Sequence, residues 1–361
     1  MGLRRTVQFA GGSVALVGGV VALALPAPYI SESPGPIFNT TADVQHDENG
    51  EETEPIIEVD GAETYPTEGT LALTTVYVNG APTSTLFVPD AVRGWFSPTV
   101  DLTPHELVYP SGTTAEEVRE RNTAAMTSSQ DLAFAAALDQ QGIEFGVELF
   151  VEGFTPEAEE AGVGEQLQPG DRVLAADGEQ ITGIEGLRSA VNEAAGEPVR
   201  LTVLRGDEEI GIDVPTYQEA DGDYYMGTLM GTDFDFPVEG ELRLSENVGG
   251  PSAGLMFALG IIDTMSEDSL TGGESWAGTG TVDPDGTVGP IGGIPQKIVG
   301  ARDAGAEHFL APRENCDELN GRLVSGLDVY GVETVDEAVE VLEAVRDDDQ
   351  DFLRQSEPCG R

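Results

Sequence analysis

Basic residues are scarce in this chain of 361 residues. Only 17 lysines and arginines stand against 66 aspartates and glutamates, and the formal net charge is −49. A surface this acidic repels phosphate, so the composition argues against binding of nucleic acid. It suits solubility in concentrated salt, where the Debye length falls to about 3 Å, although an acid-biased proteome would explain it equally well.

Cysteine and histidine are also sparse. The two cysteines, Cys316 and Cys359, are too few for a disulfide-dense scaffold. They can form one bridge that ties the C-terminal segment to the body if the domain lies outside the cell, or they can stay two thiols. The three histidines, His46, His105 and His308, show no H-E-x-x-H spacing. The sequence therefore predicts no metal site and no cofactor.

Lysine is the scarcest basic residue, because Lys297 is the only one and the other sixteen basic residues are arginine. An ammonium group can be desolvated until it loses its proton, whereas a guanidinium stays charged. Lys297 ends the segment Ile291-Gly-Gly-Ile-Pro-Gln-Lys297, forty-five residues after Ser252 in Gly250-Pro-Ser252-Ala-Gly254. A neutral lysine beside a serine hydroxyl is a nucleophile with its general base. The sequence therefore predicts a catalytic Ser252–Lys297 pair.

The apolar run that is long enough to span a bilayer lies at the N-terminus. Arg4 and Arg5 precede an uncharged stretch from about Phe9 to Ile30, rich in Val, Ala, Leu and Gly. About 20 such residues cross a bilayer core, and positive charge before them favours a cytoplasmic N-terminus. We expect residues 1–30 to be a cytoplasmic stub and a single-pass transmembrane helix, with the bulk of the chain outside the cytoplasm. A cleaved signal peptide is the alternative.

Turn signals and hydrophobic periodicity organise the residues that follow. The segment 31–68 is rich in Pro, Glu, Asp and Thr, which predicts a polar linker. Strands are expected at 69–78 and at 106–109. A helix is expected from Thr114 to Leu138, because Glu116 and Glu117 occupy its first turn and apolar residues recur at helical spacing.

The pattern changes at about residue 143. A helix is expected at 186–195, and strands are expected at 146–151, 171–177, 198–204 and 209–214. This ordered set resembles a PDZ domain of the kind found in bacterial envelope proteases. The resemblance implies a groove between the 146–151 strand and the 186–195 helix, where a peptide would add as a further strand. No clear carboxylate-binding loop is visible, and the alternative is a small spacer or lid domain.

The segment around Ser252 has the composition of a helix start. Pro251 stands where helices accept proline, at the first turn of an apolar helix that is expected to reach Met265. Ser252 would then lie at the positive end of this helix, where backbone N–H groups can hold a developing oxyanion. We take Gly250 and Ala253 as supporting residues.

These residues resemble the proteolytic domain of Lon proteases, which uses a Ser-Lys dyad. The family's Gly-Pro-Ser-Ala-Gly motif is matched in full at 250–254, and its lysine segment is matched from Pro290 to Lys297. Thr279 holds the place of a threonine that approaches the lysine amine in that family. The downstream family pattern is also matched, at Ala304-Gly-Ala306 and Pro312-Arg-Glu-Asn315.

The whole layout resembles a narrower group, membrane-anchored bacterial proteases that join a PDZ domain to a Lon-type domain without the ATPase module. Ser33-Pro-Gly-Pro36 and Met126-Thr-Ser-Ser-Gln130 fit that group as well. Gly249 departs from the family pattern, because an acidic residue often stands three places before the serine. The chain has no Walker A motif, so the resemblance implies an ATP-independent serine endopeptidase of the cell envelope that acts on unfolded, short or exposed polypeptides. The oligomeric state stays open, with a homo-oligomer as one alternative.

The expected fold is an α/β (α+β) Lon-type proteolytic domain with an inserted PDZ-like β domain, behind an N-terminal transmembrane helix. The Lon-type domain would comprise 69–142 and 217–346, interrupted by the PDZ-like domain at 143–216 and followed by an acidic tail at 347–361. An isolated pair of strands is marginal in water, so the 69–78 strand needs neighbours from later in the chain. Closing a long loop costs only about 0.6 kcal/mol per doubling of its length, so the insertion is tolerable.

Two other functions fit parts of the sequence. Gly250-Pro-Ser-Ala-Gly254 also matches the nucleophile motif of an α/β-hydrolase-type esterase, which needs an Asp and then a His after the serine. His308 is the only histidine after Ser252. A non-catalytic PDZ scaffold with a protease-like domain is the other alternative, and it would be expected to have lost Ser252 or Lys297.

Overall fold

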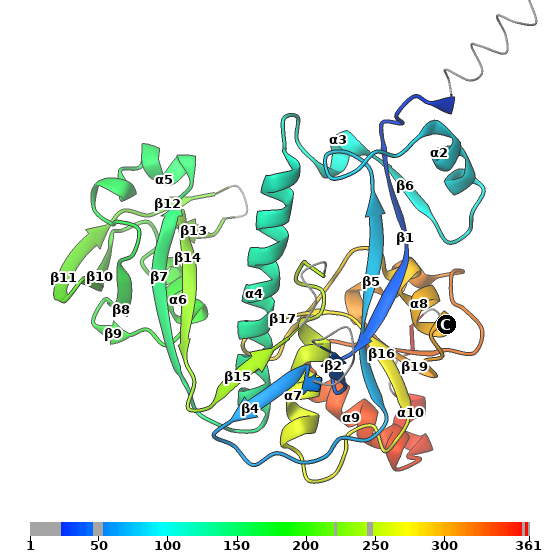
Figure 1. Ribbon diagram of the computed structural model, residues 1–361. Coiled ribbons are helices and arrows are strands. Elements are labelled where there is room, and N and C mark those ends of the chain that lie inside the picture. Colours follow the sequence, from blue (N-terminus) through cyan, green and yellow to red (C-terminus); the bar gives the residue numbers. More distant parts are fainter. Residues whose placement is uncertain (1–22, 46–52, 220–221, 244–247, 356–357, 360–361) are drawn as a thin grey trace, which may run out of the picture. The chain divides into compact units, whose positions relative to one another are not determined.

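The computed structural model describes residues 23–45, 53–219, 222–243, 248–355 and 358–359. Contacts between Cα atoms divide the chain into two compact units (Figure 1). The first unit combines Met1–Ile143 with Val238–Arg361, and the second unit is Glu144–Pro237. The first unit is therefore assembled from two stretches of sequence that the second unit separates.

A six-stranded mixed sheet forms the centre of the first unit, in the order β20-β19-β16-β5-β1-β6. Strands β5, β16, β19 and β20 are parallel, and β1 is antiparallel to its neighbours β5 and β6. The bounds are β1 Tyr29–Asn39, β5 Thr70–Asn79, β6 Asp101–Pro104, β16 Ser275–Gly278, β19 His308–Pro312 and β20 Asp328–Val332. Because β5 pairs with β1 on one side and β16 on the other, both stretches are needed to complete the sheet.

Helices cover the two faces of this sheet. On one face, Ile294 and Ile298 of α8 (Ile294–Asp303) pack in one buried cluster with the small residues Ala72 and Ala277. Successive strand residues point to opposite faces, so Gly278 faces the other side, where it lies against α7. That side carries α7 (Gly254–Met265), which contacts both α4 (Ala115–Gln140) and α9 (Val335–Arg346).

The start of α4 agrees with the sequence. Thr114 is the N-cap, its hydroxyl accepts from the backbone N–H of Glu117, and the Glu117 carboxylate accepts from the N–H of Thr114. This capping box satisfies two N–H groups that a helix start leaves without partners. The remaining elements of the unit are short: β2 Asp43–Gln45, β3 Thr53–Pro55, β4 Ile57–Asp60, α2 Val88–Trp95, α3 His105–Val108, β15 Glu239–Leu242, β17 Thr281–Val282, β18 Val288–Gly289, η2 Arg313–Leu319 and α10 Gln350–Gln355.

The segment 31–68 differs from the polar linker that its composition predicts. It begins inside the eleven-residue strand β1, and Ile56, Ile57 and Val59 are buried. The reason is the backbone of β5, whose N–H and C=O groups need a partner along one edge, and β1 supplies it from Ser31 to Asn39.

The strand expected at 106–109 is wrong. Residues 106–109 form no strand, because the turn α3 closes there with Tyr109 N–H donating to the His105 carbonyl, and β6 takes the position beside β1.

Part of the acidic tail at 347–361 is joined to the body, as the bridge considered for the two cysteines would require. It contains α10, and Cys359 is buried in a disulfide with Cys316.

Most of the predicted transmembrane segment, 9–30, lies outside the described residues. Its last two residues, Tyr29 and Ile30, open strand β1 instead of ending a helix. Among the described residues, none of the helices is both long and apolar enough to cross a bilayer.

The second unit is a small sheet domain with the strand order β11-β10-β8-β7-β14. Its buried core joins residues of β7, β8, β10 and β11 to Leu187 and Val191 of α6. Its elements are β7 Gly146–Phe154, α5 Pro156–Glu160, η1 Val163–Glu165, β8 Arg172–Ala176, β9 Glu179–Gln180, α6 Ile184–Glu193, β10 Val199–Arg205, β11 Glu208–Val214, β12 Tyr217–Gln218, β13 Tyr224–Tyr225 and β14 Thr228–Asp235. The unit therefore extends beyond residue 216, because β14 belongs to its sheet.

The peptide groove expected along 146–151 is not open. Strand β14 pairs antiparallel with β7 from Gly146 to Phe154. On the other edge of β7, Leu149 and Phe150 pair with β8, and the Val151 N–H donates to the Asp171 carbonyl. A peptide cannot add to the β7 edge that β14 occupies, because the backbone N–H and C=O groups on that edge already bond to β14.

Candidate active site

Ser252 lies in the loop that leads into α7, and α4 holds this loop in place. The Gly250 N–H donates to the Asn122 carbonyl at 3.1 Å, and the Ser129 hydroxyl donates to the Pro251 carbonyl at 3.1 Å. Gly250 has a φ of 92°, which favours glycine. The helix itself begins at Gly254 with Ala253 as its N-cap, so Ser252 precedes the first turn in which the sequence placed it.

Lys297 reaches Ser252 from the first turn of α8. Its Nζ lies 2.7 Å from the Ser252 Oγ and 2.7 Å from the Thr279 Oγ1. The Thr279 hydroxyl in turn donates to the Ser252 carbonyl at 2.8 Å. Thr279 therefore holds both the amine and the backbone of the serine. The structure brings together the three residues that the sequence proposed for this chemistry.

Burial sets the protonation of the lysine. The side chain of Lys297 is 2% exposed, and burial lowers its pKa from 10.5 to about 7. The nearby carboxylate of Glu32 acts in the opposite direction and raises the pKa of Lys297. Glu32 lies on β1 directly opposite Asp101 of β6. Burial and the charge of Asp101 raise the pKa of Glu32. Sequence reasoning missed Glu32, because 265 residues separate it from Lys297.

The Ser33-Pro-Gly-Pro36 motif allows α8 to approach β1. A Cβ atom on Gly300 would come within 3.0 Å of the Gly35 carbonyl oxygen, so the helix and the strand are in backbone contact there. A larger residue at Gly300 would push α8, and Lys297 with it, away from β1, whereas a side chain at Gly35 would meet Thr75 of β5. This places the motif in the support of the site, a role that the sequence alone did not assign.

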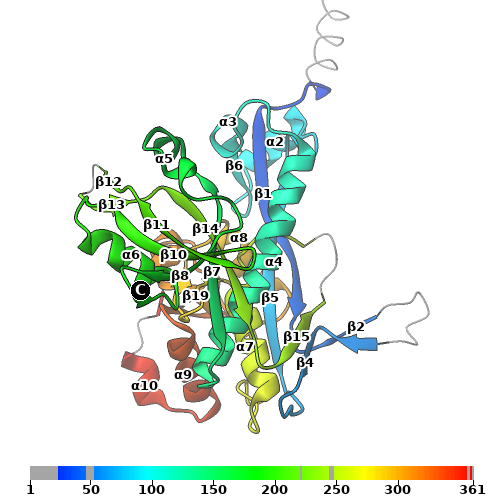
Figure 2. The same ribbon diagram turned by 90° about the vertical axis from the view of Figure 1, so that its left-hand side faces the viewer.

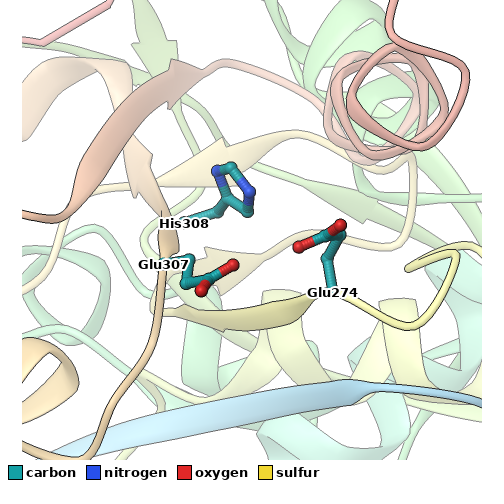
Figure 3. A group of neighbouring side chains, drawn as sticks. All are labelled: Glu274, Glu307 and His308. Carbon is teal, nitrogen blue, oxygen red and sulfur yellow. The ribbon is translucent and has the colours of Figure 1, made fainter.

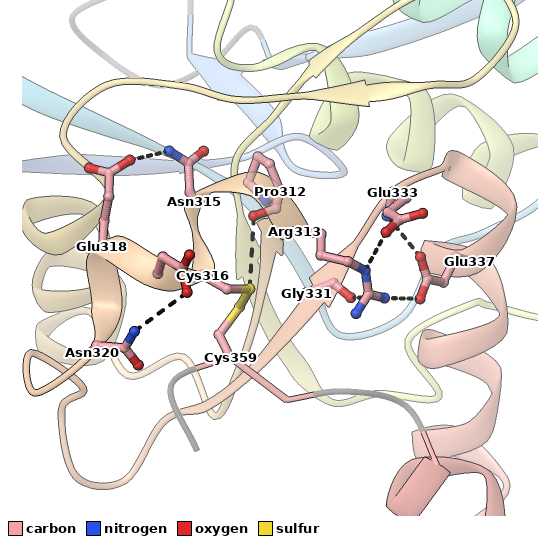
Figure 4. Close-up of a disulfide and its surroundings, with 11 residues drawn as sticks. Pro312, Arg313, Asn315, Cys316, Glu318, Asn320, Gly331, Glu333, Glu337 and Cys359 are labelled. Atoms are coloured by element: carbon pink, nitrogen blue, oxygen red, sulfur yellow. Dashed lines mark hydrogen bonds and ion pairs between the residues drawn. A yellow bond between two sulfur atoms is a disulfide. The ribbon is translucent and has the colours of Figure 1, made fainter.

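Asn315 fixes the loop that leads into α8, and Figure 4 shows this residue beside the disulfide, with its side chain bound to Glu318. Its side chain is 2% exposed. Its Oδ1 accepts from the Ile291 N–H at 2.9 Å, and its Nδ2 donates to the Ile291 carbonyl at 3.0 Å and to Glu318 at 2.6 Å. The neighbouring Cys316 forms the disulfide with Cys359. The sequence identified Asn315 through the Pro312-Arg-Glu-Asn315 pattern, but it did not predict the contact of Asn315 with Ile291.

A cleft of about 820 Å³ opens beside the serine and the lysine. Strand β5 forms one wall, and its pairing with β16 ends at Leu73 opposite Gly278. Beyond Leu73, this edge of β5 has no strand partner within the described parts of the chain. The lining residues include Thr74, Thr75, Val76, Tyr77, Val78, Tyr109, Asn122, Met126, Gly249, Gly250, Ser252, Ala253, Gly292 and Lys297.

A group that could hold a metal ion lies elsewhere. Glu274, Glu307 and His308 offer ligand atoms within 4.8 Å of one another (Figure 3). They stand at the N-terminal ends of β16 and β19, whereas Thr279 follows the C-terminal end of β16. Both glutamates are exposed, and burial lowers the pKa of His308. These residues belong to the opposite end of the sheet from Ser252 and take no part in its chemistry.

Comparison with known proteins identifies two regions. Residues 246–345, which contain Ser252, Thr279 and Lys297, match the Lon protease (S16) C-terminal proteolytic domain, and residues 157–205 match the PDZ domain. Both matches confirm domain resemblances that the sequence predicts. The PDZ domain of the SdrC-like protein of Listeria monocytogenes is 20% identical with a TM-score of 0.20, over 24% of this chain and 86% of that one.

The similar curated proteins are Lon proteases. Lon protease 1 of Sorangium cellulosum is 39% identical over 93 residues, which are 25% of this chain and 11% of that protein. The Lon protease of Koribacter versatilis is 28% identical over 121 residues, 31% of this chain and 15% of that protein. Lon protease 2 of Bacillus subtilis is 31% identical over 93 residues, 26% and 16% of the two chains. This chain thus spans a small part of its relatives' length, and what it shares with them, a Lon-type proteolytic region, supports a serine-type endopeptidase.

Proposed function

We propose that this protein is an endopeptidase in which Ser252 is the nucleophile and Lys297 is the general base. The observation that carries this proposal is the only lysine of the chain, buried, with its Nζ 2.7 Å from the Ser252 Oγ and a pKa of about 7. Such a lysine is half neutral near pH 7, so it can take a proton without a large energetic penalty. An arginine at this position could not do so.

The reaction begins when the Ser252 Oγ attacks the peptide carbonyl and its proton passes to the Lys297 Nζ. The C–N bond then breaks, and the same proton leaves with the amine product. Water repeats the sequence on the acyl-enzyme and releases the acid. Thr279 keeps Nζ directed at Ser252 throughout, since it contacts both groups.

Backbone N–H groups beside the serine are available for the oxyanion. The N–H of Gly250 donates to Asn122 and that of Leu255 to Gly280. By contrast, the described residues provide no acceptor for the N–H of Ser252 or of Ala253. Backbone donors of this kind beside the nucleophile are the arrangement that stabilises a tetrahedral intermediate.

The substrate is a polypeptide in extended form. The open edge of β5 beyond Leu73 runs along the cleft, and its backbone groups can pair with a peptide as a further strand. The chain has no Walker A motif, which supports cleavage without ATP of segments that are already unfolded or exposed. The role of the PDZ-like unit is recognition or regulation through a surface other than the β7 edge, which β14 occupies.

The location we propose is the cell envelope, with the bulk of the chain outside the cytoplasm. The uncharged run that starts at about Phe9, preceded by Arg4 and Arg5, supports an N-terminal anchor. The Cys316–Cys359 disulfide favours an oxidising compartment.

Cleavage of an unfolded protein without ATP tests the proposed activity. Ser252→Ala and Lys297→Arg are each expected to abolish cleavage, and the double variant should lose no more than either one, because the two residues act as a unit. Arg302→Lys, on the exposed side of the same helix, is the matched control and should keep full activity. Retained cleavage in Lys297→Arg would overturn the dyad. Loss of activity in His308→Ala with Lys297→Arg still active would favour an esterase-type site instead.

A further inference from the structure

Large apolar side chains are exposed at the end of the first unit where the described chain begins. Phe96 is 85% exposed, Leu107 is 78% exposed and Trp95 is 66% exposed. We call them, together with Leu23, Leu25 and Phe87, the N-terminal patch. Exposed Trp and Phe side chains gathered at one end of a molecule mark an interaction surface more often than a plain surface.

Backbone hydrogen bonds join the elements of the patch. The Val88 N–H donates to the Leu25 carbonyl, and the Ala27 N–H donates to the Leu86 carbonyl. The His105 N–H, at the start of α3, donates to the Pro28 carbonyl. Both views show α2 and α3 beside the start of β1 (Figures 1 and 2). The residues that enter β1 are thus fastened to the helices that carry Trp95 and Leu107.

The patch is unusual in charge as well. Between residues 69 and 100 the only charged residues are Asp90 and Arg93, and these two pair with each other at 2.8 Å. This stretch is neutral in a chain whose net charge is −49. An acidic surface is repelled by anionic lipid headgroups. A neutral apolar surface is not. The part of the patch that lies on α2 and its flanks is such a surface and can approach a bilayer, while α3 adds one exposed acid, Glu106, beside Leu107.

The sequence that precedes the patch indicates its occupant. Leu23 and Leu25 belong to the uncharged apolar run that extends from about Phe9 to Ile30. We propose that the N-terminal patch rests on the lipid bilayer, with Trp95, Phe96 and Leu107 in the interfacial layer. Helices α2 and α3 would then contact the membrane surface beside the N-terminal anchor. Trp side chains favour this layer, since one part of the ring is apolar and the other is polar. The inference rests on the membrane location proposed above and is independent of the peptidase chemistry.

Docking of the patch would hold the cleft close to the membrane. Tyr109, directly after α3, lines the cleft. Tyr29 precedes Pro34 by five residues, and Pro34 pairs with Val76 of the cleft wall. At about 3.3 Å per residue this is a span of roughly 17 Å. The polypeptides within reach are therefore segments near the membrane surface.

The two tryptophans of the chain allow a direct test, because Trp95 is exposed whereas Trp276 is fully buried. The full chain, carrying Ser252→Ala to prevent self-cleavage, is reconstituted in phosphatidylcholine vesicles with and without lipid brominated near the headgroup end of its acyl chains. Bromine is expected to quench the emission of Trp95. The Trp95→Phe variant keeps only the buried Trp276, so its emission should be the same with and without brominated lipid.

A second pair of variants separates docking from simple proximity. Phe96→Ser with Leu107→Ser should reduce the quenching of Trp95, whereas Leu323→Ser, which changes an exposed leucine outside the patch, should leave it unchanged. Equal Trp95 emission with and without brominated lipid would overturn the proposal. If, in addition, Trp95 were protected from quenching by aqueous iodide, a second copy of the chain and not the bilayer would cover the patch, and the proposal would be overturned. The two proposals can fail separately. If the chain with Ser252 cleaves its substrate but brominated lipid does not quench Trp95, membrane docking is wrong and the peptidase proposal stands.

Discussion

Lys297 is held between two opposing influences at the residue scale. Burial lowers its pKa to about 7, and the Glu32 carboxylate raises the same pKa. Chain-wide acidity adds to the second influence, but exposed charges are screened within a Debye length of about 8 Å at physiological salt. The burial of Lys297 itself, which is 2% exposed, therefore decides the protonation of the base.

The pH dependence of cleavage follows from this balance. A general base works only when it is neutral, so kcat/KM should rise with pH through an apparent pKa of about 7. In Glu32→Gln the carboxylate that raises the pKa of Lys297 is absent, so the rising limb is expected to move to lower pH. Steady-state kinetics from pH 5 to 10 on an uncharged peptide would measure this.

Glu120→Gln is the matched control, because Glu120 is exposed on α4 and should leave the limb in place. A limb that stays in place or moves to higher pH in Glu32→Gln would show that Glu32 does not act on Lys297.

At the element scale, the site depends on contacts between segments that are far apart in the sequence. Helix α4 holds the Ser252 loop through Asn122 and Ser129, and β1 allows α8 to approach through Gly35. The segment η2 holds the loop before α8 through Asn315. The contacts of Asn122, Ser129 and Asn315 use backbone groups of the two loops, so they fix the positions of these loops whatever side chains the loops carry.

The bond between Asn315 and Ile291 gives an element-scale prediction. Asn315→Ala removes both hydrogen bonds to Ile291, and Asn315→Asp keeps an acceptor but loses the donor and places a second carboxylate beside Glu318. Both variants should lower kcat by about ten- to a hundredfold, since small misplacements of a catalytic group have costs of this size. Water that enters beside the loosened α8 would also raise the pKa of Lys297, so the rising limb should move to higher pH.

Asn320→Ala, in the exposed residue that follows the same segment, is expected to change neither quantity. If Asn315→Ala lost stability but kept the wild-type kcat and pH limb, Asn315 would have a structural role only.

At the scale of the whole molecule, the peptidase unit is discontinuous in sequence. Strands β1, β5 and β6 and helix α4 come from before the second unit, and Ser252 and Lys297 come from after it. The two ends of the second unit lie together, because Gly146 pairs with Asp235. Paired Cα atoms on antiparallel strands are about 5 Å apart, so a short linker can replace the whole unit.

Two shortened chains test this organisation. A fragment of 238–361 contains the dyad but lacks β5, so β16 loses its neighbour, and the fragment should neither fold nor cleave. A chain in which a short Gly-Ser linker replaces 144–237 should fold and cleave an unstructured peptide. Circular dichroism, thermal unfolding and the peptide assay would check both. An active 238–361 fragment would refute the discontinuous unit.

The sequence by itself determined the features that are encoded locally. The motif at 250–254, the lysine segment ending at Lys297 and the capping box at Thr114 each lie within a few residues, so spacing and residue type are enough to read them. The strand and helix pattern of the second unit was predictable for the same reason, since hydrophobic periodicity reports local structure.

Only the tertiary structure decided the features that need distant partners. Strand β1 looks like a linker because its composition is polar and rich in proline, and only its hydrogen bonds to the distant strands β5 and β6 make it a strand. Strand β14 was placed outside the second unit, at a boundary of residue 216, because its pairing with β7 is likewise not visible in the sequence. Glu32 and Asn315 act on the site across gaps of 265 and 24 residues. Backbone pairing and burial depend on what else is nearby in space, and a single sequence carries no local mark of that.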